Sequence, residues 1–600
     1  MESTPGSDRS VRLPLSLLLL YGFPSFAGAA MLVPIYIHLP KFYSDAVGVP
    51  LGILAIGIAA ARALDALSDP LVGWLSDRTR TRWGRRRPYI ALGSPLCALA
   101  FYALFAPPET LDAASASAWF AASFILYFVL HTVYSLPHYA LGPELTLDYH
   151  ERTRLFGFRE AFAILGTVIA AAAPGALISA GGLSERAAFR DLGLVFAIAL
   201  AFSCLLLAAR VRERPEFATR TSNPFVPGVR RALRNQPFRV LLGTYMIGSI
   251  AGAIPGTFMP FFNAYVIQPE NPAGWLAIYL AAYFGAGFLC LPGWVWAARR
   301  FGKKPTWLAS FAFGITGGAA MFFVGAGDTL ATLLLITWSG SAFGAGLFIG
   351  PSIQADVIDY DELHTGKRRE AQYTAFWAML PKFVAIPSAA IPIAVLATLG
   401  YQPNVPQTPE VVLAIKTIFA LTPAFFSALA FVVALRFPID EAVHARIRLG
   451  IEAHARGDAA LDPLTGASVL PPRARAVDED TGWFLDHFSR RELEAFLARG
   501  AAGIVARVAG AVALSAAICA GAAWIVADRV TTLDADPGAL AVMAIVVAGF
   551  ALAVVFYHVA RLAQASRLAR GAVEPAVVAA WLEGAPAAAR LAPLPGDAVG

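Results

Sequence analysis

The sequence predicts an all-α integral membrane protein with two bundles of six transmembrane helices, followed by two additional C-terminal transmembrane helices. Hydrophobic residues make up 57% of the 600 residues and charged residues only 15%, against about 25% charged in soluble domains. Apolar runs of about 20 residues, the length that crosses a bilayer, recur along the chain. Together with a mean hydropathy of +0.60, these observations exclude a set of soluble domains, a disordered chain and a nucleic-acid-binding protein.

Fourteen apolar runs are predicted to span the membrane. The first twelve fall into two groups of six, because a basic linker with several prolines follows the sixth run. A long polar segment separates the twelfth run from the last two. The predicted spans are residues 13–39, 49–75, 88–106, 117–142, 158–180, 191–210, 239–266, 274–298, 305–326, 329–356, 372–399, 411–436, 504–527 and 539–561.

This pattern divides the chain into five regions. Two six-helix bundles flank a cytoplasmic central linker, a plan common among secondary transporters. A second cytoplasmic linker contains Ser489-Arg-Arg-Glu492, which has the form of a capping box and predicts a short amphipathic helix. Two extra spans and a cytoplasmic tail complete the chain. The five regions are residues 1–210, 211–238, 239–437, 438–502 and 503–600.

The two bundles share a weak internal repeat. Gly84-Arg-Arg-Arg-Pro88 follows the second span, and Gly302-Lys-Lys-Pro-Thr306 follows the eighth. A short basic loop with glycine and proline therefore occupies the same place in each half. This match favours duplication of a six-span unit.

Basic residues are distributed unevenly between alternate loops, although the net charge of the whole chain is only +6. One set of loops holds 24 Lys and Arg, whereas the opposite set holds 3. Cytoplasmic loops carry the excess of Lys and Arg, so we expect a plasma or inner membrane protein with both termini in the cytoplasm. The basic loops are residues 76–87, 143–159, 210–239, 299–304 and 367–369, and the opposite loops are 40–48, 107–116, 181–190, 267–273, 327–328 and 400–410.

The second span holds the densest group of charges within an apolar run. Arg62, Asp65 and Asp69 are three and four residues apart, so they share one face of a helix. Two carboxylates one turn apart, with the Ser68 hydroxyl nearby, suit a small hard cation such as Na⁺. They also suit a proton, because two neighbouring carboxylates hold a proton more readily than one. A structural ion pair made by these residues is the alternative, since charged side chains persist in a bilayer with a partner or with a function.

The eleventh span carries Lys382 with apolar residues on both sides. A lysine in the bilayer core pairs with a carboxylate or loses its proton. Asp65 and Asp69 are the obvious partners, and the three residues would then form one electrostatic unit. The alternative is a lysine whose stem extends to place the ammonium group at the membrane interface.

Polar side chains of the fourth span predict a polar cavity, and Arg159 and Glu160 open the fifth span. A buried histidine satisfied by a neighbour and a structural Arg159–Glu160 ion pair are the alternatives. The polar residues of the fourth span are His131, Thr132, Tyr134, Ser135, His138 and Tyr139.

The acidic stretch 355–370 (ADVIDYDELHTGKRRE) has two interpretations, a metal site or a set of salt bridges between loops. The basic residues that end the stretch favour salt bridges. The sequence contains no G-x-x-x-x-G-K, H-E-x-x-H or G-x-S-x-G motif. An enzyme is therefore not predicted.

Several stretches carry a resemblance to a known family. They are residues 64–90 (LDALSDPLVGWLSDRTRTRWGRRRPYI), 136–154 (LPHYALGPELTLDYHERTR), 355–370, and Lys382 followed by 400–404 (GYQPN). Together they resemble the glycoside–pentoside–hexuronide:cation symporter family of the major facilitator superfamily, over about residues 10–437.

The resemblance implies a major facilitator-type fold, with twelve helices in two pseudo-symmetric bundles around a central cavity. It implies that Asp65 and Asp69 match the family's cation-binding aspartates, which serve Na⁺ in some members and protons in others. Ser68 and Thr132 fall at positions similar to other cation ligands, and Lys382 at the position of a coupling lysine.

The sequence also departs from the family pattern. In the melibiose permease, a member of this family, two further aspartates on spans one and four hold sugar hydroxyls. Ser135 stands at the span-four position, and the span-one position falls near Ala29. Arg159 resembles a span-five arginine of the cavity. The family includes a vertebrate sodium-dependent lysolipid symporter with a more apolar cavity, and residues 438–600 lie outside the usual pattern.

The sequence therefore predicts a cation-coupled (Na⁺ or H⁺) secondary symporter that moves a sugar- or glycoside-type solute by alternating access. The alternatives are a lysolipid or amphiphile transporter and a non-transporting membrane sensor. The expected partners are the small-molecule solute and membrane lipid, with no nucleic acid and no resident cofactor, and the expected state is a monomer. The predicted substrate cavity comprises Arg62, His131, Ser135, Tyr139 and Arg159, and the predicted cytoplasmic gate comprises Asp77, Arg85, Arg86 and Arg87.

Overall fold

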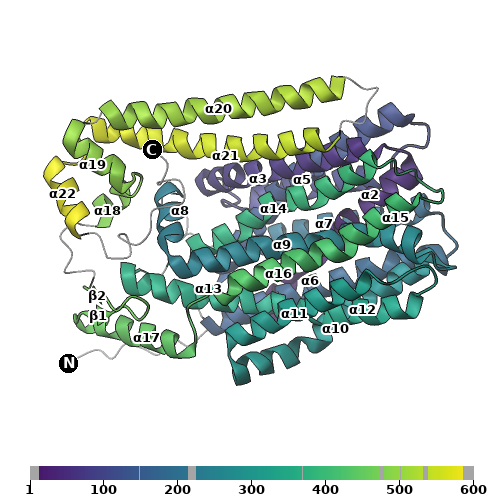
Figure 1. Cartoon of the computed structure of the whole chain (residues 1–600), viewed down its shortest axis with the longest axis horizontal. Helices are drawn as coiled ribbons and strands as arrows, with labels where there is room; N and C mark the ends of the chain where they lie inside the picture. The colour runs from purple at the N-terminus through teal and green to yellow at the C-terminus, as the bar shows by residue number, and fades with distance from the viewer. Residues whose placement is uncertain are drawn as a thin grey trace.

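The protein is a bundle of long helices with a small additional module at one end (Figure 1). The computed structural model describes residues 12–146, 149–213, 225–367, 369–471, 479–500, 502–531 and 538–584. Within these residues the strands are β1 (Ala460–Leu461) and β2 (Ser468–Val469), which pair antiparallel. The all-α prediction is confirmed apart from this small hairpin.

The N-terminal half comprises α1 (Leu15–Val33), the π-helical turns η1 (Pro34–His38) and η2 (Phe42–Val47) around α2 (Leu39–Lys41), α3 (Leu51–Arg78), α4 (Arg87–Phe105), α5 (Ala113–Leu145), α6 (Tyr149–Ser179) and α7 (Glu185–Arg210). The C-terminal half comprises α8 (Phe225–Arg234), α9 (Gln236–Phe262), η4 (Asn263–Ile267), α10 (Pro272–Phe301), α11 (Lys303–Met321), α12 (Thr329–Ser341), α13 (Phe343–Thr365), α14 (Glu370–Thr398), α15 (Pro409–Lys416), η5 (Thr417–Leu421) and α16 (Thr422–Leu435). The extension comprises α17 (Glu441–Arg456), the hairpin, α18 (Glu479–Leu485), α19 (Arg490–Arg499), α20 (Ala502–Thr531), α21 (Gly538–Ala569) and α22 (Pro575–Gly584).

Each of the fourteen predicted spans falls on a helix or on a run of consecutive helices. By length and composition, eleven helical segments among the described residues are long and apolar enough to cross a membrane. The other three predicted spans are also helical and correspond to α3, α11 and α14. The division into six, six and two spans remains a prediction from sequence.

Helix starts follow ordinary capping chemistry, in which a side-chain oxygen accepts a hydrogen bond from an otherwise unpaired amide of the first turn. The predicted capping box is confirmed, because Ser489 and Glu492 each accept a hydrogen bond from the other's backbone amide at the start of α19. Side-chain caps also open α5, α7, α9, α10, α15 and α17, at Asp112, Ser184, Asn235, Asn271, Thr408 and Asp440.

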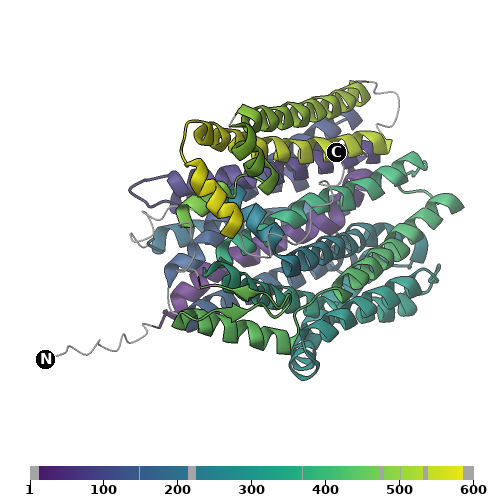
Figure 2. The same ribbon diagram turned by 60° about the vertical axis from the view of Figure 1, so that its left-hand side comes forward.

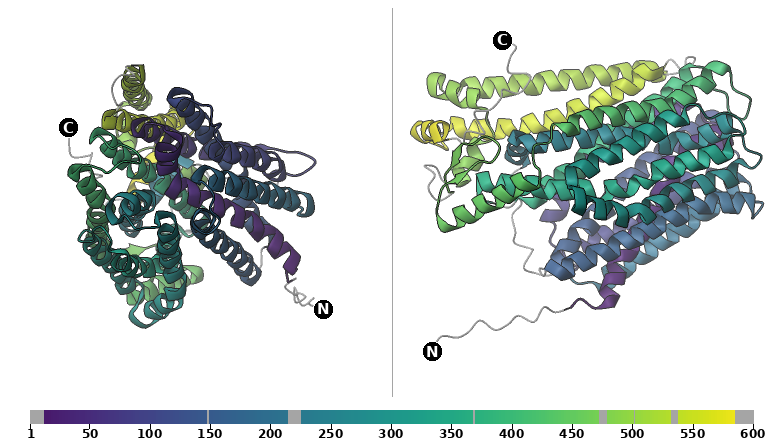
Figure 3. Two further views of the ribbon diagram at one scale, coloured as in Figure 1. Left: turned by 90° about the vertical axis from the view of Figure 1, so that its right-hand side faces the viewer. Right: turned by 60° about the horizontal axis from the view of Figure 1, so that its bottom comes forward.

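The two halves lie side by side, and the extension covers one edge. Viewed along the bundle, the purple and blue N-terminal half and the teal and green C-terminal half occupy opposite sides (Figure 3, left). Contacts between the halves run mainly along two seams, α3 against α14 and α6 against α10. The helices α20 and α21 stay at the edge of the bundle in each view (Figure 2).

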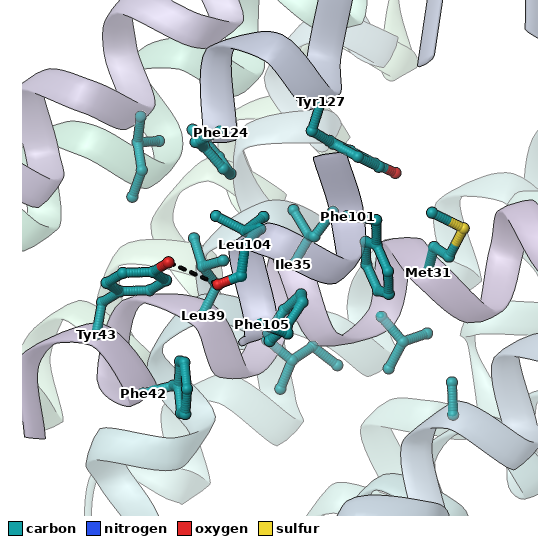
Figure 4. Close-up of a cluster of buried hydrophobic side chains, with 14 of the residues drawn as sticks. Met31, Ile35, Leu39, Phe42, Tyr43, Phe101, Leu104, Phe105, Phe124 and Tyr127 are labelled. Atoms are coloured by element: carbon teal, nitrogen blue, oxygen red, sulfur yellow. Dashed lines mark hydrogen bonds between the residues drawn. The ribbon is translucent and has the colours of Figure 1, made fainter. Parts of the chain in front are cut away.

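Aromatic side chains fill the core of the N-terminal half. Phe42, Phe101 and Phe105 pack with rings 5.0 to 5.9 Å apart (Figure 4). Tyr43 is fully buried and donates its hydroxyl proton to the Leu104 carbonyl at 2.6 Å. A buried tyrosine needs such a partner, so this bond fixes the end of α4 against the irregular end of the first span.

Candidate cation site and its surroundings

Two carboxylates of α3 converge on one hydroxyl of α5. The Thr132 Oγ1 atom lies 2.8 Å from Asp65 Oδ1 and 3.1 Å from Asp69 Oδ1. Thr132 is fully buried, Asp65 is 2% exposed and Asp69 is half-buried. The spacing of four residues places both carboxylates on one face of α3, as the sequence predicts. Three oxygen atoms from two helices therefore meet within hydrogen-bonding distance.

Arg62 lies one turn before Asp65 and is 5% exposed. Its guanidinium donates to the Tyr36 hydroxyl at 2.8 Å. The guanidinium carbon lies 4.3 Å from the centre of the Tyr36 ring and 4.1 Å from that of Phe128. Arg62 is thus held between two aromatic rings, an arrangement that stabilises a buried cation.

Ser68 and Lys382 occupy different places relative to the carboxylate cluster. The Ser68 hydroxyl donates to the backbone carbonyl of Asp65 at 3.0 Å. Lys382 belongs to α14, the helix that packs against α3. The Lys382 side chain lies outside the described residues, so its pairing with the aspartates remains a prediction.

The predicted cavity residues of α5 and α6 lie in distinct surroundings. His131 is half-buried beside the rings of Tyr127 and Tyr134, at 5.7 and 5.3 Å. Ser135 is buried. Tyr139 is exposed, and the Arg159 guanidinium lies 5.4 Å from the centre of its ring.

Arg159 also forms an ion pair with Glu160, which was one of the two interpretations of this residue pair. The structure therefore brings Tyr139 and Arg159 together, and it places Thr132 with the carboxylates.

The arginines of the predicted gate contact acidic residues of their own half. Glu144 accepts hydrogen bonds from Arg85 and Arg86 at 2.6 Å each. The backbone amides of residues 85, 86 and 87 donate to the Glu213 carboxylate at 2.7 to 2.8 Å. These contacts brace the start of α4 against the ends of α5 and α7. The Asp77 side chain lies outside the described residues, and a gating role for these residues remains a prediction.

The C-terminal half repeats this brace. Lys303 binds Asp356, at the corresponding position near the end of the tenth span, with distances of 2.7 and 2.8 Å to its carboxylate oxygens. Lys304 donates to the carbonyls of Leu435, the last residue of α16, and of Phe437, just beyond the twelfth span. The two basic loops of the internal repeat therefore make equivalent contacts in both halves.

The acidic stretch 355–370 forms ion pairs, as favoured above. Besides Asp356, Asp359 contacts His444 of α17 at 2.9 Å, and Asp361 pairs with Arg369. Throughout the described ranges, no group of three or more His, Cys, Asp and Glu residues is arranged to hold a metal ion.

Hydrogen bonds between the halves gather at the end of the bundle opposite these braces. We call the end with Arg85–Arg87 and α8 the basic end, and the end with loop 106–112 and loop 400–408 the neutral end. They lie at the left and right of Figure 1. At the neutral end, Asp45 of η2 accepts hydrogen bonds from the hydroxyls of Tyr265 and Tyr401, both at 2.7 Å. Asn404 donates to the Asp45 carbonyl at 2.7 Å. This neutral-end cluster (Asp45, Tyr265, Tyr401 and Asn404) holds the halves together at one end.

The sequence did not indicate the neutral-end cluster or the pairing of Glu144 and Glu213 with the first basic loop, whereas Asp356 lies in the stretch for which salt bridges were favoured. Asp45 pairs with Lys41 four residues earlier, at 2.8 Å, but the tyrosines that it binds in the other half lie more than 200 residues away. One signal was available, because tyrosines near a carboxylate at the ends of spans are typical hydrogen-bond donors.

We expect Asp45→Ala to loosen the neutral end. Hydrogen bonds to a charged group contribute about 1.5–3 kcal/mol each, so losing those from two tyrosines shifts the halves apart. A cysteine at Ala264, which lines a cavity of about 140 Å³ between the halves near this end, should then react faster with a membrane-impermeant maleimide. Asp191→Ala, in an exposed pair with Arg190, is the control, and equal rates in the two variants would contradict the expectation.

The duplicated six-span plan, the paired basic loops and the intramembrane carboxylates all indicate a transport protein. The profile of the family described as MFS/sugar transport protein matches residues 20–441. The chain belongs to the MFS/sugar transport protein family. This membership confirms a major-facilitator transporter and excludes the enzyme class. The two last spans and most of the extension lie beyond the matched residues.

Relatives of this MFS protein include named symporters. It is 25% identical over 540 residues to an uncharacterized symporter of Synechocystis, covering 74% of this chain and 98% of that protein. It is 23% identical to the isoprimeverose transporter of Lactiplantibacillus pentosus, covering 75% and 94% of the two chains. It is 25% identical to the sodium-dependent lysophosphatidylcholine symporter 1 of Mus musculus, covering 69% and 85%.

Solved structures confirm the fold of this MFS protein. A D-xylose–proton symporter aligns with a TM-score of 0.51 at 15% identity, covering 71% of this chain and 98% of that one. A bacterial homolog of the human lysosomal transporter Spinster, in an inward-facing conformation, aligns with a TM-score of 0.51 at 13% identity, covering 73% and 97%.

Proposed function

We propose that the protein is a cation-coupled secondary symporter that moves a sugar- or glycoside-type solute by alternating access. The convergence of Asp65 and Asp69 on the Thr132 hydroxyl carries the proposal. A hydroxyl has one proton to donate, so it gives a full hydrogen bond to one carboxylate at a time. A Na⁺ ion or a proton between the carboxylate oxygens relieves their mutual repulsion.

The position of these carboxylates supports coupling. They lie on α3, which packs against α14 along a seam between the halves. A cation that neutralises charge at a seam lowers the cost of closing that seam around a solute. When the coupling ion is absent, the ammonium group of Lys382 on α14 supplies the positive charge that balances Asp65 and Asp69. The relatives' names support symport of a glycoside-type solute.

The orientation in the membrane and the oligomeric state that we propose are those expected from the sequence. We place the basic end and both termini in the cytoplasm of a plasma or inner membrane, on the strength of the uneven distribution of Lys and Arg. The protein acts as a monomer, with solute and lipid as its partners.

A lysolipid or amphiphile is the second candidate substrate. Ser135 and Ala29 stand where a sugar-binding carboxylate is expected, and one relative is a lysophosphatidylcholine symporter. An apolar cavity with few carboxylates suits an acyl chain better than a polyol.

Uptake into proteoliposomes tests the proposal. Purified protein is assayed with an imposed Na⁺ gradient, an imposed proton gradient, or neither, against sugars, glycosides and lysolipids. We expect one gradient to drive accumulation of one solute class. Lysolipid uptake without sugar uptake selects the second candidate. No flux of any solute under either gradient would contradict symport and favour a membrane sensor.

A further inference from the structure

The extension is anchored to the C-terminal half at the basic end. Asp486, after α18, is 2% exposed and pairs with Arg231 and Arg234 of α8. The Arg231 guanidinium lies 4.0 Å from the centre of the Trp483 ring. The next residue after α8, Asn235, caps α9 and donates to the Val357 carbonyl of α13. A buried carboxylate between two arginines therefore joins the extension to helices of the C-terminal half.

The module formed by α18, α19 and α22 of the extension is joined firmly to α21. Arg561 of α21 and Glu492 of α19 are both 7% exposed. One guanidinium nitrogen of Arg561 donates to both oxygens of Glu492, at 2.7 and 2.6 Å, and its Nε donates to the His487 carbonyl at 2.9 Å. Apolar side chains of α18–α22 form a separate small core around this pair. The module and α21 thus move as one unit.

The other part of α21 lies on the seam between the halves. It packs against α3 of the N-terminal half and against α14 of the C-terminal half. Val542 and Ile545 are buried in the main core, at 0% and 8% exposed. At Gly549 the approach is close, because a Cβ added there would lie 3.2 Å from the Cβ of Ala63. Small residues let membrane helices approach this closely, and the close packing is what holds such helices together.

This arrangement restricts the motion that alternating access requires. In the structure the neutral end is held shut by the Asp45 cluster, and α21 contacts the α3 and α14 helices together. Opening the neutral end rotates the two halves as rigid bodies, which separates α3 from α14 there. A helix fixed to the C-terminal half through Asp486 then loses its contact with α3. The packing of α21 against α3 therefore stabilises the state in which the neutral end is closed.

We propose that the C-terminal extension is an intramolecular clasp, in which α21, anchored through Asp486 on α8, bridges the α3–α14 seam and biases the protein towards the state closed at the neutral end. The clasp rests on the proposed alternating-access function, because it acts on the rocking of the two halves.

Distance measurements between spin labels test the clasp in the full chain. The labels are placed on cysteines at Glu109 and Glu410, which are exposed at the neutral end of the two halves. Cys290 and Cys519, which are not fully buried, are replaced by serine.

Gly549→Leu forces α21 away from Ala63, and Gly510→Leu on α20, where an added Cβ meets nothing within 4 Å, is the matched control. Asp486→Asn releases the anchor, and Asp458→Asn in an exposed pair is its control.

We expect Gly549→Leu and Asp486→Asn to raise the fraction of molecules with a long distance between the labels at residues 109 and 410, which is the open neutral end, by roughly fivefold or more. The controls should leave this fraction unchanged. If Gly549→Leu does not insert, Gly549→Ala and Asp486→Asn provide the same comparison. Distance distributions that match those of the controls would overturn the clasp. The readout needs no solute, so opening at the neutral end in a protein that shows no uptake contradicts the proposed function and leaves the clasp in place.

Discussion

Asp65→Asn and Asp69→Asn are each expected to remove cation-stimulated uptake at cation concentrations that half-saturate the native protein, while leaving expression and folding intact. Each substitution keeps the side-chain shape but removes the charge that attracts a cation or accepts a proton. An interaction with a charged group contributes about 1.5–3 kcal/mol, which corresponds to a loss of cation affinity of roughly 10- to 100-fold. Initial uptake rates across a titration of Na⁺ and of pH measure this loss.

Two controls separate the site from general damage. Thr132→Val removes the shared hydroxyl and should weaken coupling, whereas Thr132→Ser keeps the hydroxyl and should retain it. Asp112→Asn, at the exposed N-cap of α5, should behave as the native protein. Cation-dependent uptake that persists in both aspartate variants would place the coupling ion elsewhere.

Glu492→Ala is expected to destabilise the module formed by α18, α19 and α22 by about 3–5 kcal/mol, the cost of leaving a buried charge without its partner. Arg561 would remain among apolar side chains, and Ser489 would lose half of its capping box. Hydrogen exchange of the α19 amides measures the change. Glu494→Ala on the same helix is the matched control, because its pair with Arg490 is half exposed and such pairs contribute about 0.3–0.5 kcal/mol.

The same pair predicts a dependence on pH. Burial acts to raise the pKa of Glu492, but Arg561 and the hydrogen bonds from Ser489 outweigh it and hold the pKa below its ordinary value of 4.5. A carboxyl with a depressed folded-state pKa contributes stability above pH 4.5, and this stability is lost as the pH falls through the lower folded-state value. Acid should therefore loosen α19 in the native protein, and this acid step should be absent in Glu492→Ala.

Much of the candidate site follows from local sequence. Carboxylates spaced by four residues in an apolar run share a helical face whatever the fold, so Asp65 and Asp69 could be paired from their spacing. The capping box at Ser489 is likewise local, because its hydrogen bonds join residues three apart. The basic loops after the second and eighth spans were visible as a repeat, although the pairing of Glu144 and Glu213 with the first of them was not.

Contacts between distant segments required the tertiary structure. Thr132 entered the candidate site through a family resemblance, and its hydrogen bonds to both aspartates depend on how α5 packs on α3. Asp45 and Tyr401 are 356 residues apart, and neither carries a sequence pattern that points to the other.

The sequence by itself determined the membrane class, the helical spans and the carboxylate pair, because hydropathy and helical periodicity are properties of short segments. Only the tertiary structure decided which end of the bundle is closed and where the extension lies. Gly549 and Ala63 show the physical reason. They touch because both side chains are small and lie on different helices. A small residue in the sequence does not reveal which other helix it faces until the helices are packed together.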